Sequence, residues 1–230
     1  FTVVGWIDVF SREIYKEKYV ICKLKDIFPD YEFGSDLDIL AAEPVHFVKE
    51  VMSELNKYID HESKVNIEEV SETQIHVDFC SQDGIINIRF DIYGALPNYS
   101  KLNIDRSLFN LIIANRESKR VNGVDLYVPS IIDESLIRFF EYIEYYEIRP
   151  DKLKHLHFIV NQLQNDKDSE EFFSRLHLYT KLSLLPIPEN THFSRKVIED
   201  TEGIISNINE EIDLNKKDIE KLQILIEKYI

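Results

Sequence analysis

The sequence predicts an α/β chain in which a small mixed β-sheet flanked by helices is followed by a helical lobe. Two observations indicate this class. Up to about residue 129, short β-favouring runs alternate with amphipathic helical segments, whereas from residue 130 onward the periodicity is helical. We therefore divide the chain into an α/β domain over residues 1–129 and a helical domain over residues 130–230.

The first domain carries all the predicted strands. Three β-type segments follow one another after residue 63, and Asp83-Gly84 between the last two is a strong signal for a tight turn, so we expect a β-meander there. Pro44 favours the first turn of a helix. The predicted elements are helix 7–18, strand 19–23, a strand within 33–42, helix 44–58, strands 64–70, 74–80 and 85–93, helix 108–115 and strand 124–128.

The second domain is predicted to consist of helices over residues 130–146, 150–164 and 169–184, followed by a final helix over 205–229. The final helix repeats apolar residues at alternating three- and four-residue spacing, with Asn215 as the polar exception, which is typical of a coiled-coil seam. Three partners remain open for this seam: the chain's own helices, a second copy in a homodimer, or a further domain.

Charge and composition narrow the class of partner. The chain has 230 residues, with 27 Lys and Arg against 42 Asp and Glu, so 27 − 42 gives a net charge of −15. Long nucleic acid is a poor partner for such a chain, because binding to the phosphate backbone depends on clustered positive charge. A small anionic substrate, such as a nucleotide, needs a metal ion or a local basic group to offset the repulsion.

The sequence also gives expectations about where the protein is located in the cell and whether the chain is part of a longer protein. No apolar stretch approaches the roughly 18 residues of a membrane span, and no signal pattern opens the chain, so we expect no membrane span and a cytoplasmic location. The two cysteines lack neighbouring ligands, which argues against structural zinc. A first residue other than Met and an end within a helical pattern lead us to expect a piece of a longer protein.

The segment Gly34-Ser35-Asp36-Leu37-Asp38-Ile39-Leu40 is the most informative for chemistry. Alternation along a strand places Asp36 and Asp38 on one face while the intervening apolar residue points to the core. Two carboxylates at this spacing repel one another, and a hard divalent cation with oxygen ligands, Mg²⁺ or Mn²⁺, would offset the repulsion. Asp91, on a later apolar strand, is the candidate third carboxylate.

The hairpin around Asp83-Gly84 has a predicted polar face, which carries His76, Asp78, Asn87, Arg89 and Asp91. Such a face could line a cleft. The alternative is a face open to solvent, with a cross-strand pair between Asp78 and Arg89.

These residues resemble a known family. An apolar run over 19–23, then Phe28-Pro29, the paired acids Asp36 and Asp38, and a later strand with Asp91 are similar to the nucleotidyltransferase superfamily with its polymerase-beta-like fold. The variants that look most similar come from bacterial surface-polysaccharide gene clusters. The resemblance covers about residues 1–130.

The resemblance implies a metal-dependent nucleotidyltransferase. Asp36, Asp38 and Asp91 would be both the catalytic residues and the ligands of two Mg²⁺ ions that bridge the nucleotide phosphates, with Asp91 near the attacking hydroxyl. The implied acceptor is small, and a sugar or sugar phosphate in surface-glycan synthesis is the class that the similar variants suggest.

One departure from the family pattern concerns the phosphate contact. Family members carry a glycine-rich turn about ten residues before the paired acids, whereas this chain has Lys23-Leu24-Lys25, and its Ser35 directly precedes Asp36. Either the lysines supply the contact by charge, or the site has lost catalysis and become a binding or scaffolding module. The candidate phosphate-binding residues are Ser35, Lys23, Lys25, Arg89 and Lys152.

Two alternatives accompany this hypothesis. A glycosyltransferase also binds a metal and a nucleotide-sugar diphosphate through an Asp-x-Asp pair, and its independence of Asp91 would distinguish it. The other alternative is a non-catalytic interaction module. Lys152 belongs to a cation-rich stretch over 149–157 that could grip a phosphate or could be a solvated helix face.

Overall fold

The computed structural model describes residues 10, 12–31, 34–57, 63–82, 84, 87–99, 102–145, 149, 152, 154–180, 220, 221, 224, 225 and 228. The chain forms two compact units, one comprising Phe1–Pro97 with Phe109–Ser130 and the other Asn98–Leu108 with Ile131–Ile230. The predicted domain division between residues 129 and 130 stays a prediction.

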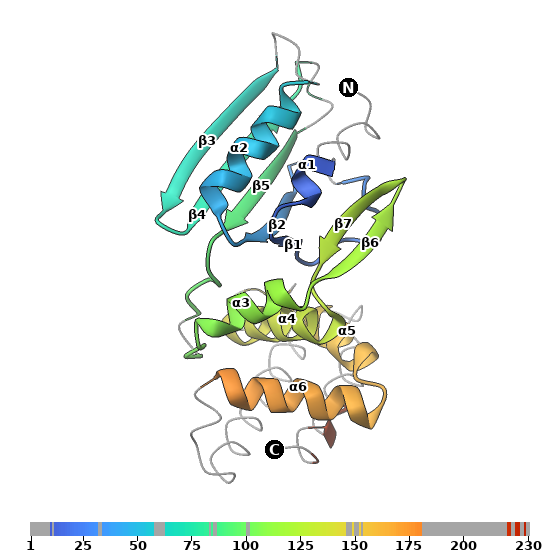
Figure 1. Ribbon diagram of the computed structural model, residues 1–230. Coiled ribbons are helices and arrows are strands. Elements are labelled where there is room, and N and C mark those ends of the chain that lie inside the picture. The colour runs from blue at the N-terminus through green and yellow to red at the C-terminus, as the bar shows by residue number, and fades with distance from the viewer. Residues whose placement is uncertain are drawn as a thin grey trace. The chain divides into compact units, whose positions relative to one another are not determined.

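The first unit contains a mixed β-sheet, as predicted, and this sheet has five strands (Figure 1). Its spatial order is β1-β2-β5-β4-β3, in which β2 and β5 run parallel and the other neighbouring strands are antiparallel. The strands are β1 (Tyr19–Ile21), β2 (Asp36–Ala41), β3 (Lys64–Ser71), β4 (Gln74–Cys80) and β5 (Asn87–Tyr93).

Helix α2 (Pro44–Leu55) covers one face of this sheet and packs on β2, β4 and β5. This packing follows from the amphipathic patterns of the helix and the strands. The helix α2 buries Phe47, Val48, Val51 and Leu55 along one side, and the central strands bury alternate residues, such as Val77 and Phe79 on β4. Complete burial of such a side chain contributes about 1.5–3 kcal/mol. The opposite face of the sheet is therefore left for polar side chains.

The remaining elements of this unit are α1 (Arg12–Tyr15) and a two-stranded hairpin of β6 (Glu117–Val121) and β7 (Val124–Val128). The strand β6 was not predicted from the sequence, because its residues are almost all polar and exposed. Pairing with β7 across Asn122-Gly123 makes it a strand. Both turn residues have positive φ, 48° and 83°, as a tight hairpin of this kind requires.

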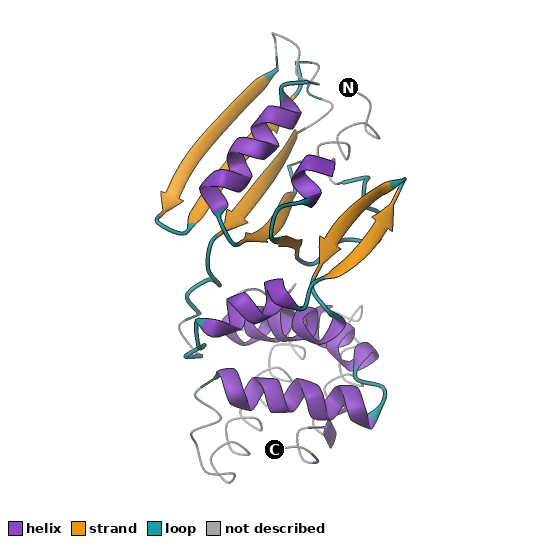
Figure 2. Cartoon of the chain, viewed as in Figure 1, coloured by secondary structure: helices purple, strands orange, loops and turns teal. Residues whose placement is uncertain are grey.

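The second unit is helical, as predicted, whereas the strands lie in the first unit (Figure 2). Its α4 (Ile131–Tyr145) packs against α5 (Lys154–Gln162) and α6 (Asp166–Tyr179). The aromatic residues Phe139 and Phe172 meet edge to face, with ring centroids 5.9 Å apart. The helix α3 (Ser107–Ala114) lies where the two units alternate along the chain.

Several predicted boundaries differ from the structure. The helix expected over 7–18 is described over Arg12–Tyr15, and the one expected over 150–164 is described over Lys154–Gln162. The helix expected from residue 169 begins at Asp166, because the side chain of Asn165 accepts a hydrogen bond from the backbone N–H of Asp168 and caps it. The predicted seam over 205–229 lies outside the described residues, apart from five helical positions between 220 and 228.

Two further findings concern the chain as described. None of its helices has both the length and the apolar character that crossing a bilayer would take. Cys22 and Cys80 are free thiols, the first buried and the second half-buried.

Candidate functional site

The candidate site lies on the sheet face opposite α2, and the register of four strands builds it. On neighbouring strands, Asp38 of β2 is paired with Asp91 of β5, which is paired with His76 of β4, which in turn is paired with Glu68 of β3. A second row, two residues along, places Asp36, Arg89, Asp78 and Asn66 side by side. Residues at a two-residue spacing share a face, so we call these two rows the polar face.

The first of the paired acids, Asp36, is exposed at the start of β2. Partial burial raises the pKa of Asp36 above its ordinary value, and the nearby carboxylate of Asp38 raises it further. The guanidinium of Arg89 opposes these effects. The raised pKa shows that negative charge at Asp36 is unfavourable in this environment.

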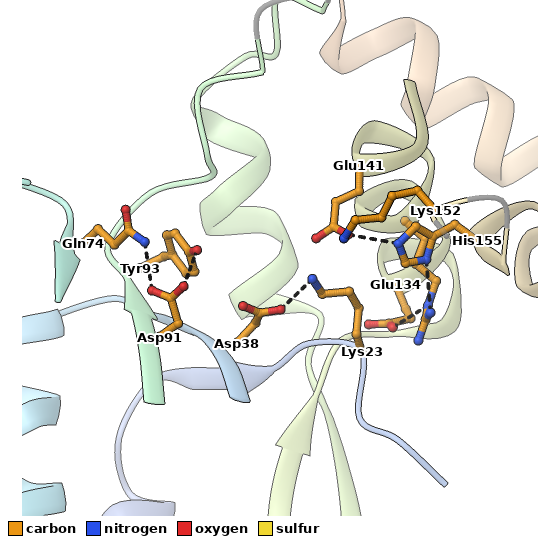
Figure 3. A network of polar contacts seen from close by, with 10 residues as sticks. Lys23, Asp38, Gln74, Asp91, Tyr93, Glu134, Glu141, Lys152 and His155 are labelled. Carbon is orange, nitrogen blue, oxygen red and sulfur yellow. Dashed lines mark hydrogen bonds and ion pairs between the residues drawn. The ribbon is translucent and has the colours of Figure 1, made fainter. Parts of the chain in front are cut away.

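The second paired acid, Asp38, faces Lys23 (Figure 3). The Lys23 Nζ lies 2.5 Å from Asp38 Oδ2, and the two side chains are about a fifth and a quarter exposed, at 20% and 24%. Lys23 has a φ of 54°, a left-handed conformation that non-glycine residues seldom adopt. The preceding Cys22 donates its backbone N–H to the carbonyl oxygen of Asp38 at 2.9 Å, which fixes the turn beside β2.

The third acid, Asp91, is buried and is surrounded by protein donors. Its Oδ1 accepts from Gln74 Nε2 at 2.9 Å and lies 3.1 Å from His76 Nε2, while its Oδ2 accepts from the Tyr93 hydroxyl at 2.7 Å. Burial raises the pKa of Tyr93, and its hydrogen bond to Asp91 raises it further. Tyr93 therefore keeps its proton and remains a donor to Asp91.

Gln74 and Tyr93 were not predicted as site residues, although a signal for them exists in the sequence. A two-residue turn at Asp83-Gly84 pairs residues whose numbers add to 167. This sum pairs His76 with Asp91 and Gln74 with Tyr93, which is the register observed. The two residues could therefore have been found by carrying the hairpin register to its end.

Arg89, a predicted phosphate-binding residue, is held by Asp78. Its Nε donates to Asp78 Oδ1 at 2.7 Å and one terminal nitrogen donates to Oδ2 at 3.1 Å. This contact lowers the pKa of Asp78. The cross-strand pair that the sequence offered as an alternative is thus present in the structure, although the Asp78 and Arg89 side chains remain about one-third exposed, at 33% and 38%.

The other predicted phosphate-binding residues lie in different places. Ser35 directly precedes β2, and its carbonyl oxygen accepts from the Arg89 backbone N–H at 3.3 Å. Lys25 is exposed in the loop after β1. Lys152 belongs to the second unit, where its Nζ lies 3.1 Å from Glu141 Oε2.

A buried polar cluster in the second unit was not predicted (Figure 3). His155 Nε2 lies 3.0 Å from Glu141 Oε2, and Arg138 approaches His155 Nδ1 at 3.3 Å. Because a guanidinium can only donate, Nδ1 is the acceptor and Nε2 carries the proton that is donated to Glu141. Arg138 also donates to Glu134 Oε1 at 2.8 Å, one turn earlier on α4, so His155 of α5 lies between two charged side chains of α4, Arg138 and Glu141.

The residues of the polar face can be tested for their fit to a metal ion. Among the residues that the structure describes, no three His, Cys, Asp or Glu side chains converge as a ready-made metal site. The donors themselves suit a hard cation, because Asp36, Asp38 and Asp91 offer carboxylate oxygens from one face, and burial and the Asp38 carboxylate raise the pKa of Asp36. Binding a cation between the paired acids would require Asp38 to exchange Lys23 for the ion.

No protein-family model and no curated protein matches the chain. Among solved structures, an H. pylori protein provisionally assigned as a nucleotidyltransferase is 12% identical with a TM-score of 0.49, over 99% of this chain and 92% of its own. JHP933 from Helicobacter pylori is 14% identical with a TM-score of 0.49, over 99% of this chain and 88% of its own. At these values neither similarity indicates a shared activity.

Proposed function

We propose that the protein is a metal-dependent nucleotidyltransferase that acts on a small acceptor. The observation that carries the proposal is the position of Asp36, Asp38 and Asp91 on one face of two adjacent parallel strands, with Asp38 directly beside Asp91. The sequence pattern of the three acids, which resembles that of the nucleotidyltransferase superfamily, supports the same proposal.

In this proposal Asp36, Asp38 and Asp91 hold Mg²⁺ or Mn²⁺. When bound, the cation neutralises charge on the nucleotide phosphates. Lys23 then contacts a phosphate by charge, as the family's glycine-rich turn would by backbone N–H groups. Gln74 and Tyr93 hold the Asp91 carboxylate in one orientation beside the acceptor hydroxyl. The acceptor hydroxyl would give its proton to the adjacent Asp91 carboxylate as its oxygen bonds to the α-phosphorus and the bond to the leaving pyrophosphate breaks.

The acceptor and the location are part of the proposal. A sugar or sugar phosphate in surface-glycan synthesis is the acceptor class that the resemblance suggests, and a cytoplasmic location accompanies it. The net charge of −15 favours a small substrate that brings its own cation over long nucleic acid.

A thermal-shift panel tests the proposal. The chain is heated with Mg²⁺ or Mn²⁺, alone and with each nucleoside triphosphate or several nucleotide-diphosphate sugars. We expect a metal-dependent rise in Tm with one triphosphate, since a ligand at about a hundred times its Kd stabilises the folded state by about 2.7 kcal/mol. The rise should vanish in Asp36→Asn/Asp38→Asn and in Asp91→Asn.

The matched control is Asp26→Asn/Asp30→Asn, which removes the same two charges from exposed positions between β1 and β2 and should keep the full shift. Lys23→Met should enlarge the shift with metal alone, because the lysine no longer competes for Asp38, and reduce the shift with triphosphate. A shift only with a diphosphate sugar, retained in Asp91→Asn, would instead support a glycosyltransferase.

A second candidate function is a non-catalytic interaction module, and a specific observation favours it. Asp38 is already compensated by Lys23, and Asp91 by Gln74, His76 and Tyr93, so these acids are satisfied by the protein itself. The same panel separates the two candidates. No shift with any metal or nucleotide would contradict the enzyme and support the module.

A further inference from the structure

The strand β3 lies at the edge of the sheet, and most of its residues are exposed. Within the described part of the chain, β4 is its one sheet neighbour, so its other edge presents unpaired backbone N–H and C=O groups. Seven of its eight residues are exposed, including the apolar Ile67 at 47% and Val70 at 45%. Helix α2 packs on β2, β4 and β5, and β3 lies beyond it (Figure 1).

The two faces of β3 differ in chemistry. Val65 and Ile67 are paired with the buried Phe79 and Val77 of β4, so they point to the α2 side of the sheet. Lys64, Asn66 and Glu68 point to the polar face. The irregularity of register between Glu69 and Ser71 lies at the far end of the strand and leaves residues 64–68 regular.

These five residues are complementary to themselves. Two copies of β3 that meet edge to edge about a two-fold axis normal to the sheet run antiparallel and keep the same face up. Opposed residues then share a face, so their numbers must add to an even sum. With a sum of 132, Lys64 lies opposite Glu68 of the second copy, Val65 lies opposite Ile67, and Asn66 meets its own copy on the axis.

Neighbouring registers lose this match. A sum of 134 places Val65 opposite Glu69 and Lys64 opposite Val70, and a sum of 136 places Glu68 opposite its own copy. Cross-strand pairs of opposite charge and of apolar residues are favourable, whereas like charges directly opposite one another are destabilising. Charge and hydrophobicity therefore select the register centred on Asn66.

We propose that β3 pairs with β3 of a second copy in this register and makes the protein a homodimer. The two sheets then form one continuous sheet, in which the two polar faces lie on the same side. The proposal does not depend on the proposed function, because it uses the edge of the sheet and not the acids of β2 and β5.

Charge reversal tests the dimer in the 230-residue chain. Molar mass is measured by light scattering during size exclusion, over a range of protein concentrations. The parent chain should be dimeric at high concentration. Lys64→Glu and Glu68→Lys should each be monomeric, since each places two like-charged pairs across the axis.

An equimolar mixture of the two variants should dimerise again. Positions 64 and 68 are both acidic in Lys64→Glu and both basic in Glu68→Lys. Both cross-strand pairs of the heterodimer therefore join opposite charges.

Cysteine crosslinking tests the register. Asn66→Cys should form a disulfide-linked dimer on mild oxidation, whereas Glu69→Cys should not, because its two copies would lie about 20 Å apart in this register. The parent chain, with Cys22 and Cys80, is the control for background crosslinking. A monomeric parent at every concentration would overturn the proposal. So would a dimer that survives both single charge reversals, or equal crosslinking at positions 66 and 69.

Discussion

Asp36 and Asp38 are two residues apart on one strand, yet their surroundings differ. Asp38 has the ammonium group of Lys23 at 2.5 Å, whereas burial and the neighbouring carboxylate raise the pKa of Asp36. An acid with a raised pKa in the folded state destabilises that state at pH values where it is ionised. The two acids should therefore respond in opposite ways to the loss of charge.

We predict that, without metal, Asp36→Asn raises the free energy of unfolding and Asp38→Asn lowers it. The first change removes an unfavourable charge, and the second removes the ion pair between Asp38 and Lys23. Urea denaturation at pH 7 with a chelator present measures both. Destabilisation by Asp36→Asn would show that this side chain has a structural partner and would weaken its role as a metal ligand.

His155 gives a second prediction at this scale, which concerns pH. Burial lowers the pKa of His155 below its ordinary value of 6.5, although its hydrogen bond to Glu141 acts in the opposite direction. The unfolded chain therefore binds a proton at a higher pH than the folded chain does. Stability from this group is present above about pH 6.5 and is lost as the pH falls below it. Protonation of Nδ1 would also oppose Arg138.

The measurement is the urea midpoint of unfolding as a function of pH. Between pH 7 and 5 the parent should lose more stability than His155→Gln does. The control is His157→Gln, which changes an exposed histidine two residues further along and should follow the parent. Parallel profiles for the parent and His155→Gln would contradict the prediction.

The sequence anticipated some residues of the site and missed others for a physical reason. Alternation along a strand is local, so it correctly placed Asp36 and Asp38 on one face and Leu37 in the core. The pairing of Lys23 with Asp38 depends on β1 lying antiparallel to β2 and on the left-handed backbone of Lys23, which no periodicity reports. The roles of the acids stay predictions.

Among the elements, those with apolar periodicity were predicted, whereas the polar strand β6 and the capped start of α6 were not. The helix α2 and the hairpin of β4 and β5 followed from their buried residues. The strand β6 has almost no apolar residues, and its hairpin signal was Asn122-Gly123. Asn165 was likewise the signal for the start of α6.

The contact between α2 and the end of β5 gives a prediction for these elements. A Cβ added to Gly94 would lie 2.8 Å from Pro44 Cγ and 3.2 Å from Pro44 Cδ, in the first turn of α2. A proline ring cannot swing away as a flexible chain end can. We expect Gly94→Ala to cost about 1–3 kcal/mol and Pro44→Ala to recover part of this loss.

A double-mutant cycle on urea denaturation measures the coupling. Gly123→Ala is the matched control, because its added Cβ meets no atom within 4 Å and its cost arises from a φ of +83°. That cost, of about 1 kcal/mol, should be unaffected by Pro44→Ala. Additive effects of Gly94→Ala and Pro44→Ala would contradict the steric explanation.

For the whole molecule, the sequence predicted the class but not the strand order. The meander of β3, β4 and β5 was expected, since these strands are neighbours in sequence. The insertion of β2 beside β5 is a long-range pairing that follows from burial of both strands under α2. Local patterns do not specify which edge of a meander the earlier strand will join.

The net charge of −15 gives a prediction for the molecule as a whole. Excess negative charge repels itself more strongly in the compact state than in the unfolded chain. Raising NaCl from about 0.01 M to 0.15 M shortens the Debye length from about 30 Å to about 8 Å, so the urea midpoint should rise. Sucrose at equal osmolality separates screening from solvent effects. A midpoint that falls with salt would show that attractive ion pairs outweigh the repulsion.

The parallel pairing of β2 with β5 also has a consequence for the order in which the site is assembled. The meander can form from contacts close in sequence, and it already brings His76 and Gln74 beside Asp91. Asp38 joins them only when the chain segment of some fifty residues from Asp38 to Asp91 closes into a loop. Such closure is slow, because the segment loses conformational entropy before any contact between its ends is gained. Asp38 and Asp91 should thus meet last, on a framework that has already formed.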